Sequence, residues 1–251
     1  DGVETTTGPL GAGLSNAVGM AMAQAHIGAK YNKDDLALFD NYTYVLAGDG
    51  CMMEGITSEA SSLAGTLGLG RLIILYDSNS ITIEGSTDLA FKENVRKRYE
   101  AYGFETFLVE DGNDMDAIDK AITQAKSNLN QPSLIEIRTQ IGAMTPLAGS
   151  AKTHGAPLGD DNIKALKEAM GYPSLEPFYV EPAVYEHMDA LLEEKHKTYL
   201  SWEAKLDAYK EKYPEDYAKW VEDNRDLTVD EFIEDKALWD FGDKPVATRS
   251  L

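Results

Sequence analysis

Side chains that could hold a divalent cation follow two apolar runs of this sequence. Asp49 stands between two glycines in V45-L-A-G-D-G-C-M-M-E-G55, directly after the first run. Asp77 and Asn79 follow the second run, R71-L-I-I-L-Y76. Carboxylate and amide oxygens suit Mg²⁺ or Ca²⁺, but they are too few here to fill about six positions. Water and the phosphate oxygens of a ligand would complete the set, so these residues indicate metal-assisted binding of a phosphate compound.

Asp49 has a second interpretation, and the residues alone leave both open. An Asp flanked by glycines near a helix start is common in ordinary turns. The separation of about 30 residues between Asp49 and Asn79 is also the length of one βαβ unit, whose two strands can lie side by side. Ligands of open α/β sheets bind at the carboxyl ends of the strands. Both side chains could therefore reach one ion, while the glycines let backbone N–H groups approach a diphosphate.

The segments around these residues predict an α/β domain. A Gly-rich turn, G8-P-L-G-A-G13, precedes a buried helix over residues 14–30. Strands are then expected to alternate with helices: strands at Tyr44–Ala47, 71–76, Glu105–Val109 and Ser133–Arg138, and helices at Met53–Leu67, Leu89–Tyr102 and from residue 111 onward. Such alternation is typical of a mostly parallel sheet. The nearly continuous apolar strand at 71–76 indicates that helices cover both faces of the sheet.

The charge of the chain restricts its partners. It carries 23 Lys and Arg against 43 Asp and Glu, a formal net charge of −20. This charge repels phosphate, which argues against a nucleic-acid or membrane partner. An anionic ligand must be held locally, by backbone N–H groups, a helix N-terminus or a metal. One cysteine fits a reducing compartment, and no apolar run approaches the roughly 18 residues of a membrane span, so a soluble, cytoplasmic protein is expected.

The chain changes character after residue 138. Residues 139–160 are rich in Gly, Pro and Ser, and a loop of this length in a compact domain is usually functional or mobile. From Asp160 onward charged helices are predicted, including a long helix at Val184–Lys212. We expect a diphosphate-binding α/β domain at residues 1–172 and a helical extension and linker at 173–251. The side chains expected to pack rather than bind are His26, Cys51, Trp202, Tyr209 and Trp220.

Two segments resemble the diphosphate-binding motif of thiamine diphosphate enzymes, which opens with G-D-G and closes about 30 residues later with Asn. They are G48-D-G-C-M-M-E-G-I-T-S-E59 and Y76-D-S-N-S-I81. Within that superfamily the sequence resembles transketolase. The matching stretches occur in order: E4-T-T-T-G-P-L-G-A-G-L-S-N-A-V-G-M-A21, S62-L-A-G-T-L-G-L-G70, Y99-E-A-Y-G-F104 and H154-G-A-P-L-G-D160. The resemblance runs from the first residue to at least Tyr172 and implies thiamine diphosphate, with Mg²⁺ or Ca²⁺, as cofactors.

The resemblance assigns the metal and diphosphate contacts residue by residue. Asp49 and Asn79 match side-chain ligands of the divalent cation that clamps the diphosphate, and Ile81 matches a residue that gives a backbone carbonyl. Gly48 and Gly50 match cofactor-binding positions, Gly50 through its backbone. Asn79 belongs to the cofactor site as well as to the metal site.

Five further residues take roles from the resemblance. Gly8, Pro9 and Leu10 match the loop that meets the aminopyrimidine ring and packs beneath the thiazolium. His154 matches a histidine close to both the diphosphate and the reacting centre. Glu54 matches a glutamate in a network that joins the two active sites of the dimer. From the residues alone, His154 would be a loop histidine and Glu54 an ordinary acid in the first turn of a helix.

The activity implied is transfer of a two-carbon ketol unit from a ketose phosphate to an aldose phosphate, within the pentose phosphate pathway and by a homodimer. In the family a glutamate from the second domain of the neighbouring subunit completes the site, and an N-terminal segment carries substrate histidines. Because the chain opens without Met and closes at K244-P-V-A-T-R-S-L251, we expect an internal fragment that holds half of the site and is inactive alone.

Two other function classes remain open at this stage. The chain could be a non-catalytic cofactor-binding or assembly fragment. It could also belong to another thiamine diphosphate enzyme, such as a decarboxylase or the deoxyxylulose-phosphate synthase type. The segment S150-A-K-T-H-G155 is shorter than the family pattern and carries Lys152, which leaves the position of this loop open.

Overall fold

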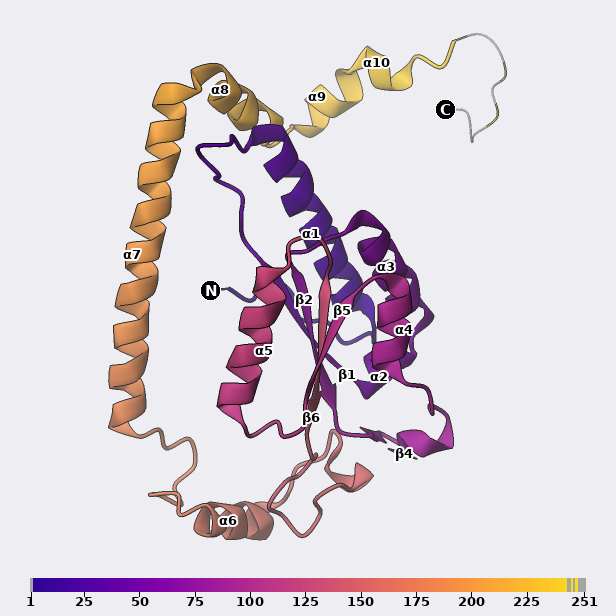
Figure 1. The fold of residues 1–251 in the computed structure, drawn as a ribbon, viewed down its shortest axis with the longest axis vertical. Helices are drawn as coiled ribbons and strands as arrows, with labels where there is room; N and C mark the ends of the chain where they lie inside the picture. The colour runs from indigo at the N-terminus through magenta and orange to yellow at the C-terminus, as the bar shows by residue number, and fades with distance from the viewer. Residues whose placement is uncertain (1, 243–244, 246, 248–251) are drawn as a thin grey trace. The chain divides into compact units, whose positions relative to one another are not determined.

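The computed structural model describes residues 2–242, 245 and 247. The chain forms two compact units, one that runs through Tyr199 and one that begins at Leu200 (Figure 1). Asp1 and residues 248–251, the two ends from which an internal fragment was expected, lie outside the described residues. The boundary expected after residue 172, between the diphosphate-binding domain and the helical extension, is a functional division and stays a prediction.

The first unit is built on a parallel sheet. Within the described residues this sheet has four strands in the order β1-β2-β6-β5, and each neighbouring pair is parallel. The strands are β1 (Thr43–Gly48), β2 (Leu72–Ser78), β5 (Glu105–Val109) and β6 (Ser133–Arg138). The predicted mostly parallel sheet is confirmed, and each predicted strand is present within two residues of its expected ends. A separate antiparallel pair, β3 (Ile81–Thr82) and β4 (Gly85–Ser86), follows β2.

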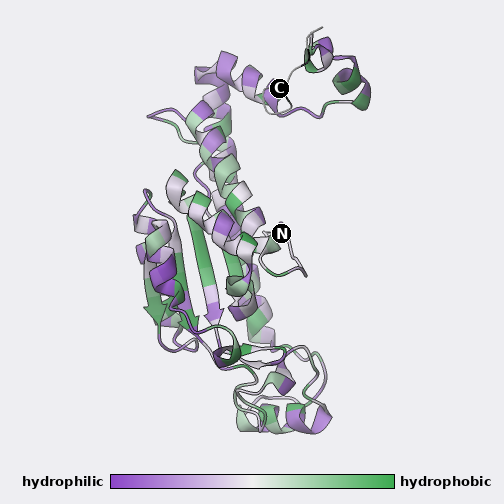
Figure 2. Ribbon diagram, turned by 90° about the vertical axis from the view of Figure 1, so that its right-hand side faces the viewer, coloured by the Kyte–Doolittle hydropathy of each residue, from purple (hydrophilic) through white to green (hydrophobic). Residues whose placement is uncertain are grey.

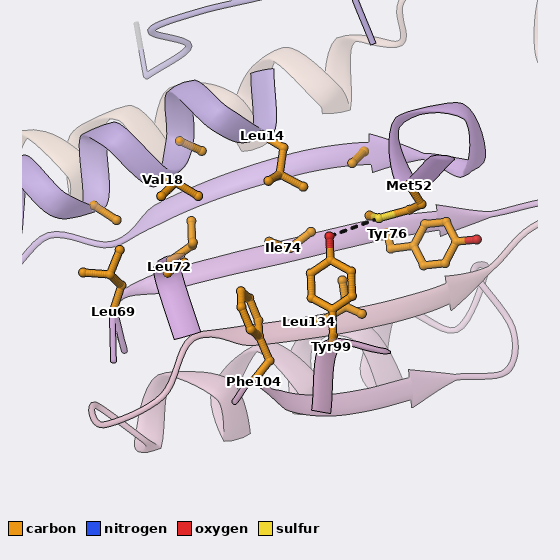
Figure 3. Packing of buried hydrophobic residues seen from close by; sticks show 14 of the residues in the cluster. Leu14, Val18, Met52, Leu69, Leu72, Ile74, Tyr76, Tyr99, Phe104 and Leu134 are labelled. Carbon is orange, nitrogen blue, oxygen red and sulfur yellow. Dashed lines mark hydrogen bonds between the residues drawn. The ribbon is translucent and has the colours of Figure 1, made fainter. Parts of the chain in front are cut away.

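Helices cover both faces of this sheet, as the apolar strands predicted. On one face, α1 (Ala12–Tyr31), α3 (Gly55–Leu67) and α4 (Val95–Tyr102) enclose a core that contains Leu72 and Ile74 of β2 (Figure 3). On the other face, α5 (Met115–Ser127) packs against Ile73, Val109 and Ile135. Alternate residues of β2 thus enter opposite cores, which is why the strand is apolar without interruption. Figure 2 shows the strands as largely hydrophobic, whereas the helices are mixed.

Three predicted helices differ from those observed. The helix expected from residue 111 begins at Met115, after Asp114 caps it by accepting a hydrogen bond from the Ala117 N–H. The helix expected at Met53–Leu67 is preceded by a short helix, α2 (Asp49–Met53), and begins only at Gly55. The helix expected at Leu89–Tyr102 begins at Val95, because the Asn94 side chain caps it by accepting a hydrogen bond from the Lys97 N–H. A short 3-10 turn, η1 (Thr87–Leu89), ends at Leu89, the residue at which the helix was expected to begin.

In the described chain, an irregular segment and five helices follow β6, and the last three of these helices lie in the second unit. Residues 139–159 are irregular, as predicted, apart from the 3-10 turn η2 (Ala151–Thr153). The helices that follow are α6 (Asp160–Ala169), α7 (Pro182–Lys212), α8 (Pro214–Asp223), α9 (Val229–Glu234) and α10 (Lys236–Trp239). The predicted long helix is α7, which crosses the boundary between the units. Among the described residues, no helix combines the length and the apolarity needed to cross a membrane.

Candidate metal and diphosphate site

The two strand ends that carry the predicted ligands lie side by side. Strands β1 and β2 are parallel neighbours, and Gly48, the last residue of β1, pairs in register with Asp77 near the end of β2. Asp49 is the next residue after β1 and the first of α2, while Asn79 directly follows β2. The adjacency expected from one βαβ crossover is therefore confirmed.

Asp49 is a buried acid held by three hydrogen-bond donors. Asp49 is only 4% exposed to solvent. Oδ1 accepts a hydrogen bond from the Tyr76 hydroxyl at 2.5 Å. Oδ2 accepts from the Ser80 backbone N–H at 2.8 Å and from the Asn79 N–H at 3.2 Å. These bonds hold the carboxylate of the first residue of α2 against β2 and the turn that follows it.

Burial governs the electrostatics of this acid. Loss of water around the carboxyl raises the pKa of Asp49, and the nearby Asp77 carboxylate adds to the rise, although the three hydrogen bonds oppose it. Burial and the bond to Asp49 also raise the pKa of the Tyr76 phenol, which keeps that hydroxyl a donor. Within the described part of the chain, no Lys, Arg or His lies within ion-pair distance of Asp49. A buried acid is rarely left without a cationic partner, so this position favours a bound cation.

The turn after β2 is stabilised by its own polar side chains. Asn79 Oδ1 accepts a hydrogen bond from the Ile81 N–H at 3.0 Å, and its amide nitrogen lies 3.4 Å from Asp77 Oδ2. Asp77 in turn accepts a hydrogen bond from the Thr139 hydroxyl, at the end of β6. Ser80 adopts a left-handed conformation with φ of 62°, which makes the turn tight. The Asn79 side chain is thus held by Ile81 and Asp77, while the backbone N–H of Asn79 contacts the Asp49 carboxylate.

Asp49, Asn79 and Ile81 line a cavity of about 930 Å³. Eight of the residues predicted for the site contribute to its wall: Leu10, Gly48, Asp49, Gly50, Glu54, Asn79, Ile81 and His154. Gly8 and Pro9 do not line it; they lie in the turn that leads to Leu10 and α1. The structure therefore brings the metal and diphosphate candidates together with His154, a residue from a loop more than 70 positions away.

The glycines at Asp49 meet different surroundings. A Cβ built on Gly48 would meet no protein atom within 4 Å, and its φ of −98° is open to any residue. The packing of the protein therefore does not require glycine there, and Gly48 is one of the residues that line the cavity. A Cβ on Gly50 would lie 3.1 Å from Leu10 Cδ1, because that leucine packs over the start of α2. The free space at Gly48 fits a ligand that approaches the backbone closely.

The donor set also fits a cation that shares its ligands with a phosphate compound. Among the described residues no three His, Cys, Asp or Glu side chains are grouped to hold a metal ion by themselves. One carboxylate, one amide oxygen and a backbone carbonyl would leave several positions for water and phosphate oxygens. A bound cation would favour the ionised form of Asp49, against the effect of burial.

Glu54 and His154 stand at the cavity wall with side chains that make no hydrogen bond or ion pair in the described part of the chain. The interpretation of Glu54 as a first-turn helix acid was wrong: it is the extended residue between α2 and α3, with φ of −72° and ψ of 138°. Gly at position 55 then starts the next helix. His154 follows η2 and is exposed. Both side chains are available to groups from outside this chain.

Two polar residues of the site were missed by sequence reasoning. Tyr76 was assigned to an apolar strand, although a phenol near the end of a buried strand needs a hydrogen-bond partner and could have been flagged for that reason. Thr139 was assigned only to the irregular loop. Its position directly after β6, next to β2 in the sheet, was the available signal.

Comparisons with known proteins identify the family of the chain. A family model described as transketolase, thiamine diphosphate binding domain, matches residues 1–226. The transketolase of Geobacillus stearothermophilus is 49% identical over 216 residues, which cover 85% of this chain and 32% of that protein. Transketolase 1 of Saccharomyces cerevisiae is 52% identical over the same length and with the same coverage. The chain thus spans about a third of the length of the curated relatives it matches.

Solved structures give the same result. A transketolase from Pichia stipitis in complex with sedoheptulose-7-phosphate superposes with a TM-score of 0.84 at 47% identity, covering 86% of this chain and 32% of that one. A transketolase from Leishmania mexicana has a TM-score of 0.84 at 40% identity, covering 87% of this chain and 33% of that one. With the family model matching most of its residues, the chain belongs to the transketolase family, within the thiamine diphosphate binding domain.

Proposed function

We propose that the complete gene product containing this chain is a transketolase, and that this chain supplies the cation and diphosphate half of its site. The observation that carries the proposal is the buried Asp49 carboxylate, which lacks a cationic partner within the described residues and lines a cavity beside Asn79. The reaction is transfer of a two-carbon ketol unit between sugar phosphates. Membership of the family supports this reaction over other chemistry of the same cofactor.

Thiamine diphosphate, when bound, supplies the carbon nucleophile and the electron sink for such a transfer. The protein residues bind and orient it. We assign the Asp49 carboxylate, the Asn79 amide oxygen and the Ile81 carbonyl to Mg²⁺ or Ca²⁺. Gly48 and Gly50 leave the backbone accessible to the diphosphate, and Gly48 has the free space for it.

The other site residues have roles at the reacting end. Leu10 lines the cavity and packs over Gly50, and Gly8 and Pro9 shape the turn before it, so this segment would support the organic part of the cofactor. His154 is an exposed imidazole at the wall, placed to hydrogen-bond a phosphate or substrate oxygen. Glu54 presents a carboxylate with no partner in the described chain, which suits a contact across a homodimer.

The remaining parts of the proposal concern the whole protein. Substrates are sugar phosphates, the assembly is a homodimer, and the compartment is the cytoplasm. The functional domain that holds the cofactor ends near residue 172, and 173–251 form an extension toward further segments. Neither nucleic acid nor membrane is a partner, because a net charge of −20 repels both.

The test uses the purified complete gene product with Mg²⁺ and thiamine diphosphate. Transfer of a ketol unit from a ketose phosphate to an aldose phosphate is expected, and it should disappear when either cofactor is omitted. The 251-residue chain alone is expected to show no transfer. Cofactor-dependent decarboxylation of a 2-oxo acid without ketol transfer would overturn the reaction assigned here. Binding without any turnover by the complete product would favour a non-catalytic module.

Tyr76→Phe tests the support of the proposed metal ligand. The substitution removes the hydroxyl that donates to Asp49 Oδ1 and keeps the ring in the core. Loss of a group that orients a metal ligand typically weakens metal binding about 10-fold or more, so the Mg²⁺ concentration for half-saturation of cofactor binding should rise by about that factor. Titration calorimetry of the complete product measures it.

Tyr102→Phe is the matched control for this experiment. Tyr102 also packs at the same core, but in the described chain its hydroxyl contacts no residue of the site. Its half-saturation should equal that of the unmodified protein. An unchanged Mg²⁺ requirement in Tyr76→Phe would show that the hydroxyl does not orient the ligand.

A further inference from the structure

The position of Asp49 depends on a helix that cannot hold itself in place. Helix α2 has five residues, with Asp49 at its start. Isolated helices shorter than about 12 residues are marginal in water, so tertiary contacts must place α2. At its first residue the contacts are the three hydrogen bonds to the Asp49 carboxylate. Those bonds use the group that would bind the cation, so the opposite end of α2 needs a support of its own.

Arg98 of α4 provides this support. Its Nη2 donates a hydrogen bond to the backbone carbonyl of Met52, in the last turn of α2, at 2.7 Å. Its Nη1 donates to the Ser58 hydroxyl of α3 at 2.6 Å. Nε lies 2.6 Å from Glu93 Oε1, an ion pair without the angle of a hydrogen bond. One planar guanidinium thus joins α2, α3 and the segment before α4.

The surroundings of Arg98 hold its side chain in one place. The side chain is 18% exposed, and its guanidinium carbon lies 5.6 Å from the ring centre of Tyr99 and 6.0 Å from that of Phe91. The Tyr99 hydroxyl also contacts the Met52 sulfur at 3.3 Å, as Figure 3 shows. A cation at the carboxyl end of a helix is favourable because the last carbonyls have no partner within the helix.

The link from Arg98 to the cation site is short. Met52 and Asp49 are three residues apart in one helix, so they lie within a single turn. A rotation or shift of the Met52 carbonyl would be carried directly to the Asp49 carboxylate. Ligand groups must be held to within roughly 0.5 Å for their geometry to be productive. Arg98 itself is not among the residues of the cavity wall, so it cannot act by touching a ligand there.

We propose that Arg98 is a positioning residue for the cation site: it anchors the carboxyl end of α2 so that the Asp49 carboxylate stays in ligand position. The inference rests on the proposed cofactor function. It predicts a defect in cation affinity that excess cation overcomes, because the ligand atoms remain present and only their alignment is lost.

The experiment measures thiamine diphosphate binding by the complete gene product as a function of Mg²⁺, together with the thermal unfolding midpoint. Arg98→Met removes every donor and keeps an apolar stem of similar length. The Mg²⁺ concentration for half-saturation is expected to rise about 10-fold, with binding restored at saturating Mg²⁺. Arg98→Lys keeps the charge but loses the planar fork, so a smaller rise, about 3-fold, is expected and is the fallback if the methionine variant does not fold.

Two variants of the same helix serve as controls. Val95→Ala opens space in the core beside α4 and should lower the unfolding midpoint without changing the Mg²⁺ requirement. Lys97→Met alters an exposed side chain and should change neither quantity. If the Arg98 variants behave like Val95→Ala, with a lower midpoint and an unchanged Mg²⁺ requirement, the positioning role is overturned. If the unmodified protein shows no Mg²⁺-dependent cofactor binding, the proposed function fails first, and this inference falls with it.

Discussion

Replacing Asp49 with alanine is expected to abolish Mg²⁺-dependent thiamine diphosphate binding by the complete gene product while leaving the domain folded. Asp49 is the one buried carboxylate among the described residues of the cavity wall. Losing residues that merely orient a metal ligand weakens binding about 10- to 100-fold, so loss of the ligand itself should exceed about 100-fold. Calorimetric titration of the cofactor at fixed Mg²⁺ measures the effect.

The fold should survive this substitution for an electrostatic reason. Asp49→Ala leaves three donors without their acceptor, which is unfavourable by about 1–3 kcal/mol for each buried group that water cannot reach. It also removes a carboxylate whose ionised form is disfavoured by burial, as the raised pKa of Asp49 indicates. These effects oppose each other, so the loss of unfolding free energy should be modest.

A charge-matched control distinguishes the loss of a metal ligand from the loss of one negative charge near the site. Asp88→Ala removes one negative charge from η1, where Asp88 is exposed and does not line the cavity. Cofactor affinity should stay at the unmodified level. If Asp49→Ala binds the cofactor as tightly as Asp88→Ala does, the ligand assignment is wrong.

Gly65→Ala is expected to have the largest effect on stability. A Cβ at this position would lie 1.8 Å from the carbonyl oxygen of Tyr102 and 2.8 Å from its carbon. Both atoms belong to the backbone, so α3 and the end of α4 would have to separate. Overpacking of this kind typically lowers the free energy of unfolding by about 3 kcal/mol or more when nothing flexible can yield. Denaturant unfolding monitored by circular dichroism measures it.

A glycine in an open position provides the comparison. Gly19 lies in α1, is exposed, and a Cβ there would meet no atom within 4 Å. Gly19→Ala should stabilise the protein by up to about 1 kcal/mol, because alanine is the better helix former. Gly65→Ala with the stability of the unmodified protein would mean that α3 and α4 do not approach as closely as the structure shows.

Local sequence patterns were sufficient for the sheet and for the adjacency of the strand ends that carry Asp49 and Asn79. The apolar runs before Asp49 and Asn79 and their separation by one crossover predicted two neighbouring strand ends, and the register of β1 and β2 confirms them. This worked because parallel strands covered on both faces must be apolar along their length, so polar residues mark their ends. The roles of Asp49 and Asn79 as ligands stay predictions.

Features that depend on tertiary contacts were not predictable in the same way. The break between α2 and α3 at Glu54 has no Pro or capping side chain to mark it. On the N-terminal side of this break, α2 is hydrogen-bonded to groups of β2 and α4, which are distant in the sequence. The role proposed for Arg98 could not be predicted for the same reason: its contacts with Met52 and Ser58 come from segments about 40 residues or more away in the sequence.

The most direct test of the cation site is the position of the cation itself. Crystals of the complete gene product grown with thiamine diphosphate and Mn²⁺ in place of Mg²⁺ would reveal the metal by its anomalous scattering. We expect one peak in the cavity at about 2.1 Å from an Asp49 carboxylate oxygen, with the Asn79 amide oxygen and the Ile81 carbonyl at similar distances. A metal bound to the cofactor but away from Asp49 and Asn79 would contradict the account.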